Sequence, residues 1–220
     1  MDRFTPRFQK QPWVDGMGVL HGYLLPRAGV DDELLDLAHT CRHELLNYPI
    51  DPVYPEEKGD PGQLHVTIEM IADAPTSQIS QVEQRTLVDA LRNELADVTP
   101  FTTELGPPIG NTAGAVMDVW PEDQAVALQE RVRAAVRATR GDAALLHKGG
   151  RLHMSLGYSY DTANSDPLNS RLRAITPRRA TLHVDTLHLL NVRFYIAADT
   201  GGWRMSWEPI AEIPLGATKA

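Results

Sequence analysis

Two short segments of the chain repeat one pattern of residue types. Leu64-His65-Val66-Thr67-Ile68 and Leu152-His153-Met154-Ser155-Leu156 each place a histidine two positions before a hydroxyl side chain. Residues two apart in a β-strand share a face and lie about 6.5 to 7 Å from each other. An imidazole exchanges a proton near neutral pH, and a hydroxyl can donate to a phosphate oxygen. The two segments therefore predict acid-base chemistry on a phosphate group.

A pair of histidines suits the opening of a cyclic phosphate by water. One group must remove a proton from the nucleophile, and another must supply a proton to the leaving oxygen. Imidazoles with an ordinary pKa of about 6.5 can do both, which predicts a bell-shaped dependence of the rate on pH. Hydroxyls and backbone amides would stabilise the charge that develops on the phosphate oxygens. The sequence leaves open which histidine is the base and which is the acid.

Shared context distinguishes the two segments from chance motifs. The chain has eight histidines, so roughly one His-x-Ser/Thr tripeptide is expected by chance. Both segments follow a leucine, precede an aliphatic residue and alternate between apolar and polar residues, as half-buried strands do. The predicted apolar faces comprise Leu64, Val66, Ile68 and Met70 in one strand and Leu152, Met154, Leu156 and Tyr158 in the other. The predicted solvent-facing sides comprise Gln63, His65, Thr67 and Glu69, and Arg151, His153, Ser155 and Gly157.

The spacing of apolar residues predicts the elements that position these strands. The predicted strands lie near residues 17–25, 63–71, 101–105, 114–120, 151–160, 180–190 and 203–214. The predicted helices cover residues 31–47, 77–98 and 121–139, and a short one follows Ser165. Residues 106–110 are predicted to form a turn, residues 49–62 a loop or mobile flap, and Arg193, Phe194 and Tyr195 a closing loop or hairpin. The order strand, helix, histidine strand, helix, strand occurs twice, which indicates an internal duplication.

The composition narrows the class of partner. A chain of 220 residues with 42% hydrophobic content can form one substantial domain or two small lobes. The net charge of −8 disfavours extended duplex nucleic acid, since such binding needs many Lys and Arg contacts with phosphates. We therefore expect a small nucleotide or an RNA end as the substrate. The single cysteine, Cys41, is predicted to be a buried apolar residue.

The apolar runs of the chain and its N-terminal residues indicate the expected location of the protein in the cell. No apolar run approaches the roughly 20 residues of a membrane-spanning helix, and the N-terminus lacks the apolar core of a secretion signal. We expect a cytoplasmic monomer that does not bind membranes. Residues 1–16, which include Arg3, Arg7 and Trp13, are predicted to form a tail or a strap over the site. Residues 17–220 are predicted to form a single bilobal domain.

The paired motifs resemble those of the two-histidine (2H) phosphoesterase superfamily, which includes RNA 2′,3′-cyclic phosphodiesterases and the bacterial 2′-5′ RNA ligases. The resemblance spans nearly the whole chain. It implies an α+β fold of two pseudo-symmetric lobes, each an antiparallel sheet with helices outside, which together form a central groove. It also implies catalysis without a metal or another cofactor. His65 and His153 would be the catalytic pair, and Thr67 and Ser155 would bind nonbridging phosphate oxygens.

Other residues near the motifs are weighed from their place on the strands. Arg151 shares the face of His153 and is predicted either to contact phosphate or to be an ordinary solvent-exposed arginine at the start of a strand. Tyr23 is predicted either to stack on a base or to pack in the core. Two departures from the family pattern are Tyr158, where many RNA-ligase-like members carry Arg, and Ser155, where Thr is commoner. The first strand also continues as Ile68-Glu69-Met70 rather than hydrophobic-small-aromatic.

The sequence predicts a metal-independent phosphodiesterase that hydrolyses a 2′,3′-cyclic phosphate or a related small nucleotide phosphoester. Two alternatives use the same residues. One is an RNA ligase-like or cyclic-oligonucleotide-cleaving enzyme, and the other is a nucleotide- or RNA-binding module without turnover. A structural protein with chance motifs is a third.

Overall fold

The computed structural model describes residues 1–146 and 150–217 of the chain. Its helices are α1 (Asp32–Leu45), α2 (Gln81–Leu95), α3 (Asp123–Arg140) and α4 (Asp166–Arg173), with short 3-10 turns at Thr76–Gln78 and Asp142–Leu145. The strands of the first half of the chain are β1 (Arg7–Phe8), β2 (Gln11–Pro12), β3 (Gly18–Leu24), β4 (Ile50–Pro52), β5 (Val66–Met70) and β6 (Phe101–Asn111). The others are β7 (Gly114–Trp120), β8 (His153–Ser159), β9 (Ala180–Val184), β10 (Thr186–Ile196) and β11 (Trp203–Pro214).

The main sheet consists of two four-stranded halves that meet at the histidine strands. The strand order is β11-β10-β3-β5-β8-β7-β6-β9, with β4 paired to β8, and neighbouring strands are antiparallel. The halves join through the pair Val66 and Met154, between β5 and β8. The first half of the sheet is β11-β10-β3-β5 and the second half is β8-β7-β6-β9, so each half has its histidine strand, β5 or β8, innermost. The predicted α+β fold of two pseudo-symmetric lobes is confirmed.

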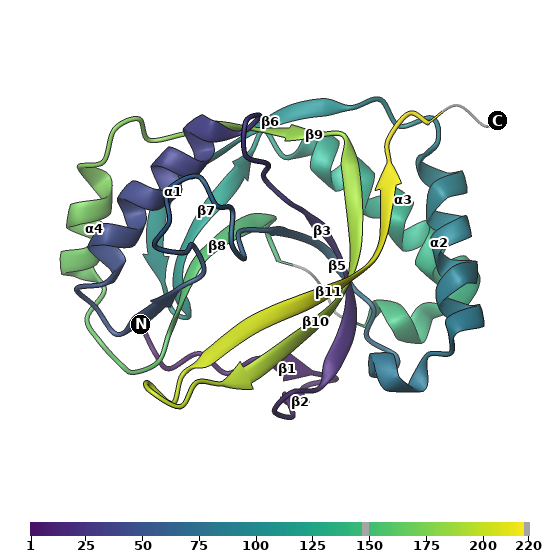
Figure 1. Cartoon of the computed structure of the whole chain (residues 1–220), viewed down its shortest axis with the longest axis horizontal. Coiled ribbons are helices and arrows are strands. Elements are labelled where there is room, and N and C mark those ends of the chain that lie inside the picture. The colour runs from purple at the N-terminus through teal and green to yellow at the C-terminus, as the bar shows by residue number, and fades with distance from the viewer. Residues whose placement is uncertain (147–149, 218–220) are drawn as a thin grey trace.

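The helices cover the outer face of the curled sheet, two on each half (Figure 1). The first half is covered by α2 and α3, and the second by α1 and α4. Helix α1 follows a strand of the first half but packs on the second, and α3 follows a strand of the second half but packs on the first. The two halves thus exchange helices. Element order along the chain could not reveal this exchange, because it depends on contacts between distant segments.

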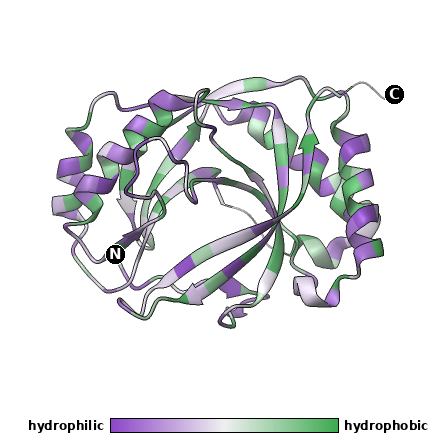
Figure 2. Ribbon diagram, viewed as in Figure 1, coloured by the Kyte–Doolittle hydropathy of each residue, from purple (hydrophilic) through white to green (hydrophobic). Residues whose placement is uncertain are grey.

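The helices form where apolar residues recur at helical spacing. Helix α2 begins with a capping box, in which Ser80 and Glu83 satisfy each other's backbone N–H groups, and it buries Leu87, Leu91 and Leu95. Apolar and polar residues alternate around each helix, and the apolar ones belong to one large core between the helices and the sheet (Figure 2). This core fixes the sheet from its outer side and leaves the concave face for the site.

Residues 1–16 lie over the concave face of the sheet. The amide of Phe4 donates to the carbonyl of Ser159 on the second half, and Gly16 donates to Phe194 on the first. Between these ends, Phe8 and Trp13 pack into a second apolar cluster on the concave face of the first half. The segment thereby crosses from one half to the other.

Two sequence predictions about the elements were wrong. Residues 106–110 are not a turn but part of the long strand β6, with an irregular register between Leu105 and Pro108. The predicted strand at residues 180–190 is two strands, β9 and β10, which join at Asp185 and pair in opposite halves of the sheet. The single residue Asp185 thus links strands from the two halves, which requires the sheet to curl. The predicted hairpin around Arg193, Phe194 and Tyr195 is confirmed, since these residues lie in β10, which pairs with β11 as an antiparallel hairpin.

Candidate active site

Each histidine strand contains a β-bulge directly after its hydroxyl residue. In β5, Thr67 pairs with Tyr23 and Glu69 with Gly22, so Ile68 has no partner on β3. In β8, Ser155 pairs with Val116 and Gly157 with Ala115, so Leu156 has no partner on β7. Bulges re-aim side chains and are frequent beside active sites. The two motifs therefore share their backbone irregularity as well as their residue types.

The bulges reverse the alternation of side chains beyond the hydroxyl residues. Met70 lies in the concave-face cluster, and Tyr158 packs against it, although both were predicted on the apolar outer face. Glu69 is buried and forms an ion pair with Arg133 of α3, on the outer side. A Cβ on Gly157 would meet Ile50 of the core, so this position also faces outward. The predicted faces are thus wrong for these four residues, because an extra residue shifts the period of two.

Helix α3 supports the bulge in the first histidine strand. The side-chain amide of Gln129 donates to the carbonyl of Ile68, at 2.6 Å, and Arg133 binds Glu69. These two residues lie one helical turn apart and hold both sides of the bulge. Sequence reasoning missed them, since four-residue spacing of polar residues on a helix does not show which strand they contact.

The pairing of β5 with β8 brings the four motif residues together. With Val66 opposite Met154 in an antiparallel register, His65 lies across from Ser155, and Thr67 lies across from His153. Diagonal neighbours of this kind are about 7 to 8 Å apart. The site therefore has the two histidines on one diagonal and the two hydroxyls on the other.

Both histidines are oriented by the same local hydrogen bond. The Nδ1 atom of His65 donates to the carbonyl of Gln63 at 2.7 Å, and Nδ1 of His153 donates to the carbonyl of Arg151 at 2.9 Å. A carbonyl oxygen only accepts, so Nδ1 carries the hydrogen and the lone pair of the neutral ring is on Nε2. In both rings, Nε2 is the atom that can exchange a proton with a substrate.

The two histidines differ in their surroundings. His65 is only 3% exposed, stacks on Tyr23 and meets the edge of the Trp207 ring at 5.9 Å. Burial lowers the pKa of His65 to about 4, and the charge of His153 acts in the same direction, against the hydrogen bond to Gln63. His153 is exposed and lies opposite Asp118 of β7. The site thus holds one buried neutral imidazole and one accessible imidazole.

A tyrosine accompanies each hydroxyl residue. Side-chain hydrogen bonds join Tyr23 to Thr67 and Tyr158 to Ser155. Burial raises the pKa of Tyr23 well above its ordinary value and that of Tyr158 to about 12, so both phenols stay protonated. Tyr23 is 2% exposed and its ring packs on His65, so of the two predicted roles the structure supports packing and not stacking on a base. Tyr158 was missed because alternation placed it in the core.

Arg151 lies at the rim of the site. Its guanidinium forms an ion pair with Asp118 at 2.8 Å, and its side chain is 64% exposed. Arg151 and His153 also line a small hollow that extends from Thr67 toward α3. The residues lining this hollow are Thr67, Ile68, Glu69, Gln129, Gly150, Arg151, Leu152 and His153.

Within residues 1–146 and 150–217, no group of three or more His, Cys, Asp or Glu side chains is arranged to hold a metal ion. In the same part of the chain, no helix combines the length and the apolar character needed to cross a bilayer.

The curled sheet with paired His-x-hydroxyl strands at its centre defines the class of two-histidine phosphoesterase folds. The sequence matches the 2′-5′ RNA ligase superfamily over residues 56–193, more than half of the chain, and the chain belongs to this family. The resemblance inferred from the motifs is thus confirmed. A search of curated proteins found no match.

Solved structures share the fold at low sequence identity. TT0787 of Thermus thermophilus is 15% identical, with a TM-score of 0.64 over 90% of this chain and 98% of that one. E. coli LigT complexed with 3′-AMP is 13% identical, with a TM-score of 0.59 over 90% and 98%. A further structure described as a phosphoesterase is 13% identical, with a TM-score of 0.59 over 92% and 99%. The chain therefore spans nearly the full length of these proteins.

Proposed function

We propose that this protein is a metal-independent phosphodiesterase that opens a 2′,3′-cyclic phosphate or a related small nucleotide phosphoester. The observation that carries the proposal is the pairing of Val66 with Met154. This pair sets two histidines and two hydroxyls around one position on the concave face. Membership of the 2′-5′ RNA ligase superfamily supports phosphoester chemistry at that position.

We infer a role for each histidine from its surroundings. His65 is buried and neutral near pH 7, so its Nε2 accepts the proton of the attacking water. The water oxygen forms a bond to phosphorus while the bond from phosphorus to one ribose oxygen breaks. That oxygen takes a proton from Nε2 of the charged His153. The product is a phosphomonoester beside a free ribose hydroxyl, and the starting state is restored when His65 releases its proton to solvent and His153 takes one up.

Thr67 and Ser155 support the phosphate during this step. Their hydroxyls lie across the strand pair from His153 and His65, respectively, and can donate to the nonbridging oxygens. Tyr23 and Tyr158, which are hydrogen-bonded to these residues, fix the two hydroxyls in place. Arg151 at the rim supplies positive charge toward the incoming anion.

An RNA ligase-like or cyclic-oligonucleotide-cleaving enzyme would use the same four residues, and a nucleotide-binding module would use them without turnover. A panel of substrates separates these functions: 2′,3′-cyclic mononucleotides, cyclic dinucleotides and RNA with cyclic-phosphate ends, each assayed with EDTA. We expect turnover of a cyclic phosphate that is lost in His65→Ala and in His153→Ala. Unchanged turnover in both variants would refute the assigned site, and binding of these ligands without turnover would favour the module.

A further inference from the structure

Trp120 is exposed on the face of the sheet that carries the site. This tryptophan ends β7 and is 57% exposed, whereas tryptophan is highly buried on average. Met117 and Val119 of β7 lie in the core, so the alternating residues Asp118 and Trp120 project from the concave face. Asp118 pairs with His153. The indole is therefore about 6.5 to 7 Å along one strand, and one strand spacing of about 4.8 Å, from the candidate acid.

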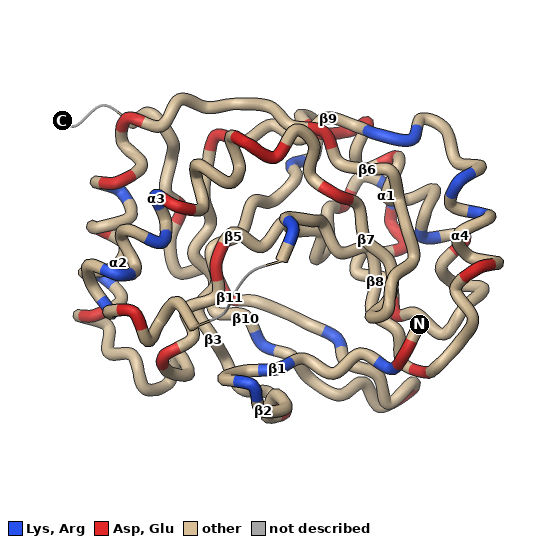
Figure 3. The backbone as a smooth tube through the Cα atoms, turned by 180° about the vertical axis from the view of Figure 1, so that it is seen from behind, with Lys and Arg blue, Asp and Glu red and all other residues tan. Residues whose placement is uncertain are grey.

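Two arginines flank the indole. The guanidinium carbon of Arg179, which directly precedes β9, lies 5.9 Å from the centre of the Trp120 ring. On the other side, the amide of Val119 donates to the carbonyl of Leu152, which brings Arg151 next to the end of β7. The basic residues in the chain between α4 and β9 are Arg178 and Arg179, and Figure 3 shows this segment in blue beside β9. Trp120, Arg151 and Arg179 form a strip that runs from His153 toward the edge of the sheet.

Each arginine pairs with a carboxylate at the surface: Asp118 is half-buried and Glu104 is exposed, while both guanidinium groups remain accessible to an anion. Arg151 pairs with Asp118 at 2.8 Å, and Arg179 pairs with Glu104 at 3.5 Å. The exposed pair of Arg179 and Glu104 contributes little to stability, so exchanging this carboxylate for a phosphate oxygen costs little, and the 64% exposed Arg151 has room to bind a second oxygen beside Asp118. A planar ring between arginines matches the sites where bases of single-stranded nucleic acid stack.

We propose that Trp120, Arg151 and Arg179 bind the nucleoside next to the one whose phosphate reacts, with its base stacked on Trp120 and its phosphate near an arginine. This inference rests on the proposed function, because it takes the reacting phosphate to lie between His65 and His153. One stacked base and one or two arginines need no extended basic surface, which agrees with the net charge of −8. The strip would make the enzyme prefer an oligonucleotide end to a cyclic mononucleotide.

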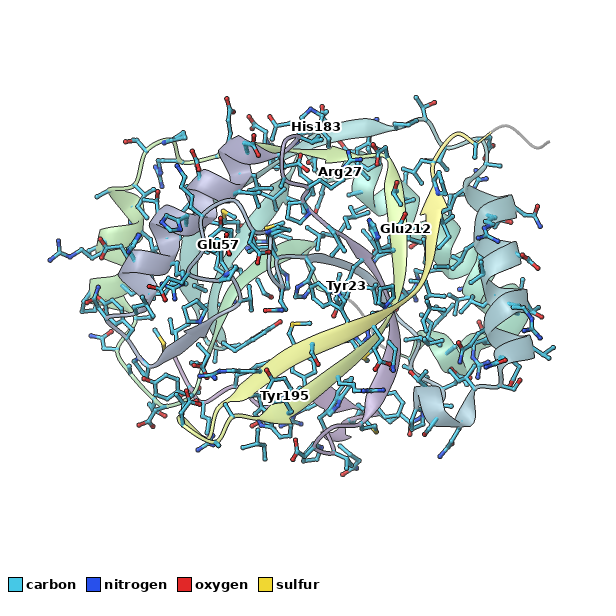
Figure 4. All side chains as sticks on the ribbon, viewed as in Figure 1. Tyr23, Arg27, Glu57, His183, Tyr195 and Glu212 are labelled. Carbon is cyan, nitrogen blue, oxygen red and sulfur yellow. The ribbon has the colours of Figure 1, made fainter. Side chains whose placement is uncertain are left out.

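The first test compares 2′,3′-cyclic CMP with a trinucleotide that ends in a 2′,3′-cyclic phosphate. We expect wild type to have the higher kcat/KM for the trinucleotide. In Trp120→Ala, the ratio of the two kcat/KM values should fall by roughly 5- to 150-fold, mainly through KM, which is the effect of losing one stacked base. Trp120→Phe should keep most of the preference. Tyr195→Ala is the matched control, since Tyr195 is an exposed aromatic residue of the other half, away from Tyr23 and the site (Figure 4).

Two results would overturn the inference. One is equal kcat/KM of the wild-type enzyme for the two substrates, and the other is a Trp120→Ala variant with the same ratio of kcat/KM values as wild type. A partner protein as the true occupant of the strip would give the second result. Binding of a fluorescent trinucleotide with a 3′-phosphate provides a readout that does not need turnover. If no substrate is turned over but Trp120→Ala weakens this binding, the inference stands and the proposed function fails. If a cyclic phosphate is turned over and the trinucleotide binds equally well to wild type and Trp120→Ala, the function stands and the inference fails.

Discussion

The imidazole of His65 lies face to face with the ring of Tyr23, with centroids 4.3 Å apart and planes inclined by 18°. Trp207 closes the arrangement, with its ring edge-on to both, at 5.7 Å from Tyr23 and 5.9 Å from His65. The three rings come from β3, β11 and the residue before β5. The backbone of the site is thus nearly symmetric, with matching bulges and hydrogen bonds, while the environments of the two histidines are not. In the proposed mechanism, this asymmetry is the basis for taking His65 as the base and His153 as the acid.

Trp207 should control the protonation of His65. In Trp207→Ala, water reaches the imidazole, so the pKa of His65 should rise from about 4 toward its ordinary value, because burial is the main cause of the lowered value. Tyr23 and His153 are the titratable groups beside it, and both remain. Titration of the ring-proton NMR signals measures the change. The exposed Trp120→Ala serves as the control, and an unmoved His65 signal in Trp207→Ala would contradict the assignment.

The buried His65 should make the fold sensitive to acid. Between about pH 6.5 and pH 4, the unfolded chain binds a proton at His65 that the folded chain does not. The contribution of His65 to the free energy of unfolding should therefore be at its maximum above about pH 6.5. It should fall by about 3 kcal/mol as the pH is lowered toward 4. Urea denaturation of wild type and His65→Asn over this range isolates the effect. Identical slopes for both proteins would show that His65 is not held neutral by the fold.

The ion pair behind the first histidine strand should be important for stability. The side chain of Glu69 is 1% exposed, so Arg133→Met leaves a buried carboxylate without its partner and should cost about 3 to 5 kcal/mol. Adding Glu69→Gln should recover part of the loss, because it removes the charge. The measurement is the free energy of unfolding in urea.

Arg137→Met is the matched control for this pair. It lies one turn further along α3, where Arg137 binds Asp142 with both side chains largely exposed, and it should change stability little. If the two arginine variants were equally stable, the support of the bulge by α3 would be disproved.

The hydroxyl of Tyr158 should contribute to catalysis by fixing Ser155. In Tyr158→Phe, the hydrogen bond with Ser155 and the donation from the phenol to the Met205 sulfur are lost, while the stacking on Phe4, at 4.3 Å, remains. A net hydrogen bond contributes about 1 kcal/mol, so kcat/KM for a 2′,3′-cyclic phosphate should fall roughly fivefold. Tyr195→Phe, which removes an exposed hydroxyl, should match wild type. Wild-type kinetics in Tyr158→Phe would exclude this role.

Local patterns predicted most elements of the fold. Apolar residues at helical spacing identified α1, α2 and α3 within a few residues of their observed ends, and alternation identified β3, β5 and β8. These patterns are local, since each depends on which side of one element meets the core. The errors arose at β6 and at the junction of β9 and β10. At β6, hairpin pairing with β7 extended the strand through a proline-containing segment. At the β9–β10 junction, pairing with distant strands divided an apparently continuous strand.

The sequence by itself determined the chemistry-bearing residues and the family, because His-x-hydroxyl spacing and its repetition can be read along one strand at a time. Only the tertiary structure decided how these residues are arranged and enclosed. The bulges at Ile68 and Leu156 depend on neighbouring strands. The bulge in β5 also depends on Gln129 of α3, a helix that follows a strand of the second half in the chain but packs on the first half. The burial of His65 depends on Trp207, which is far away in the sequence and meets it only because the sheet curls. A lowered pKa is a property of that enclosure, and no motif encodes it.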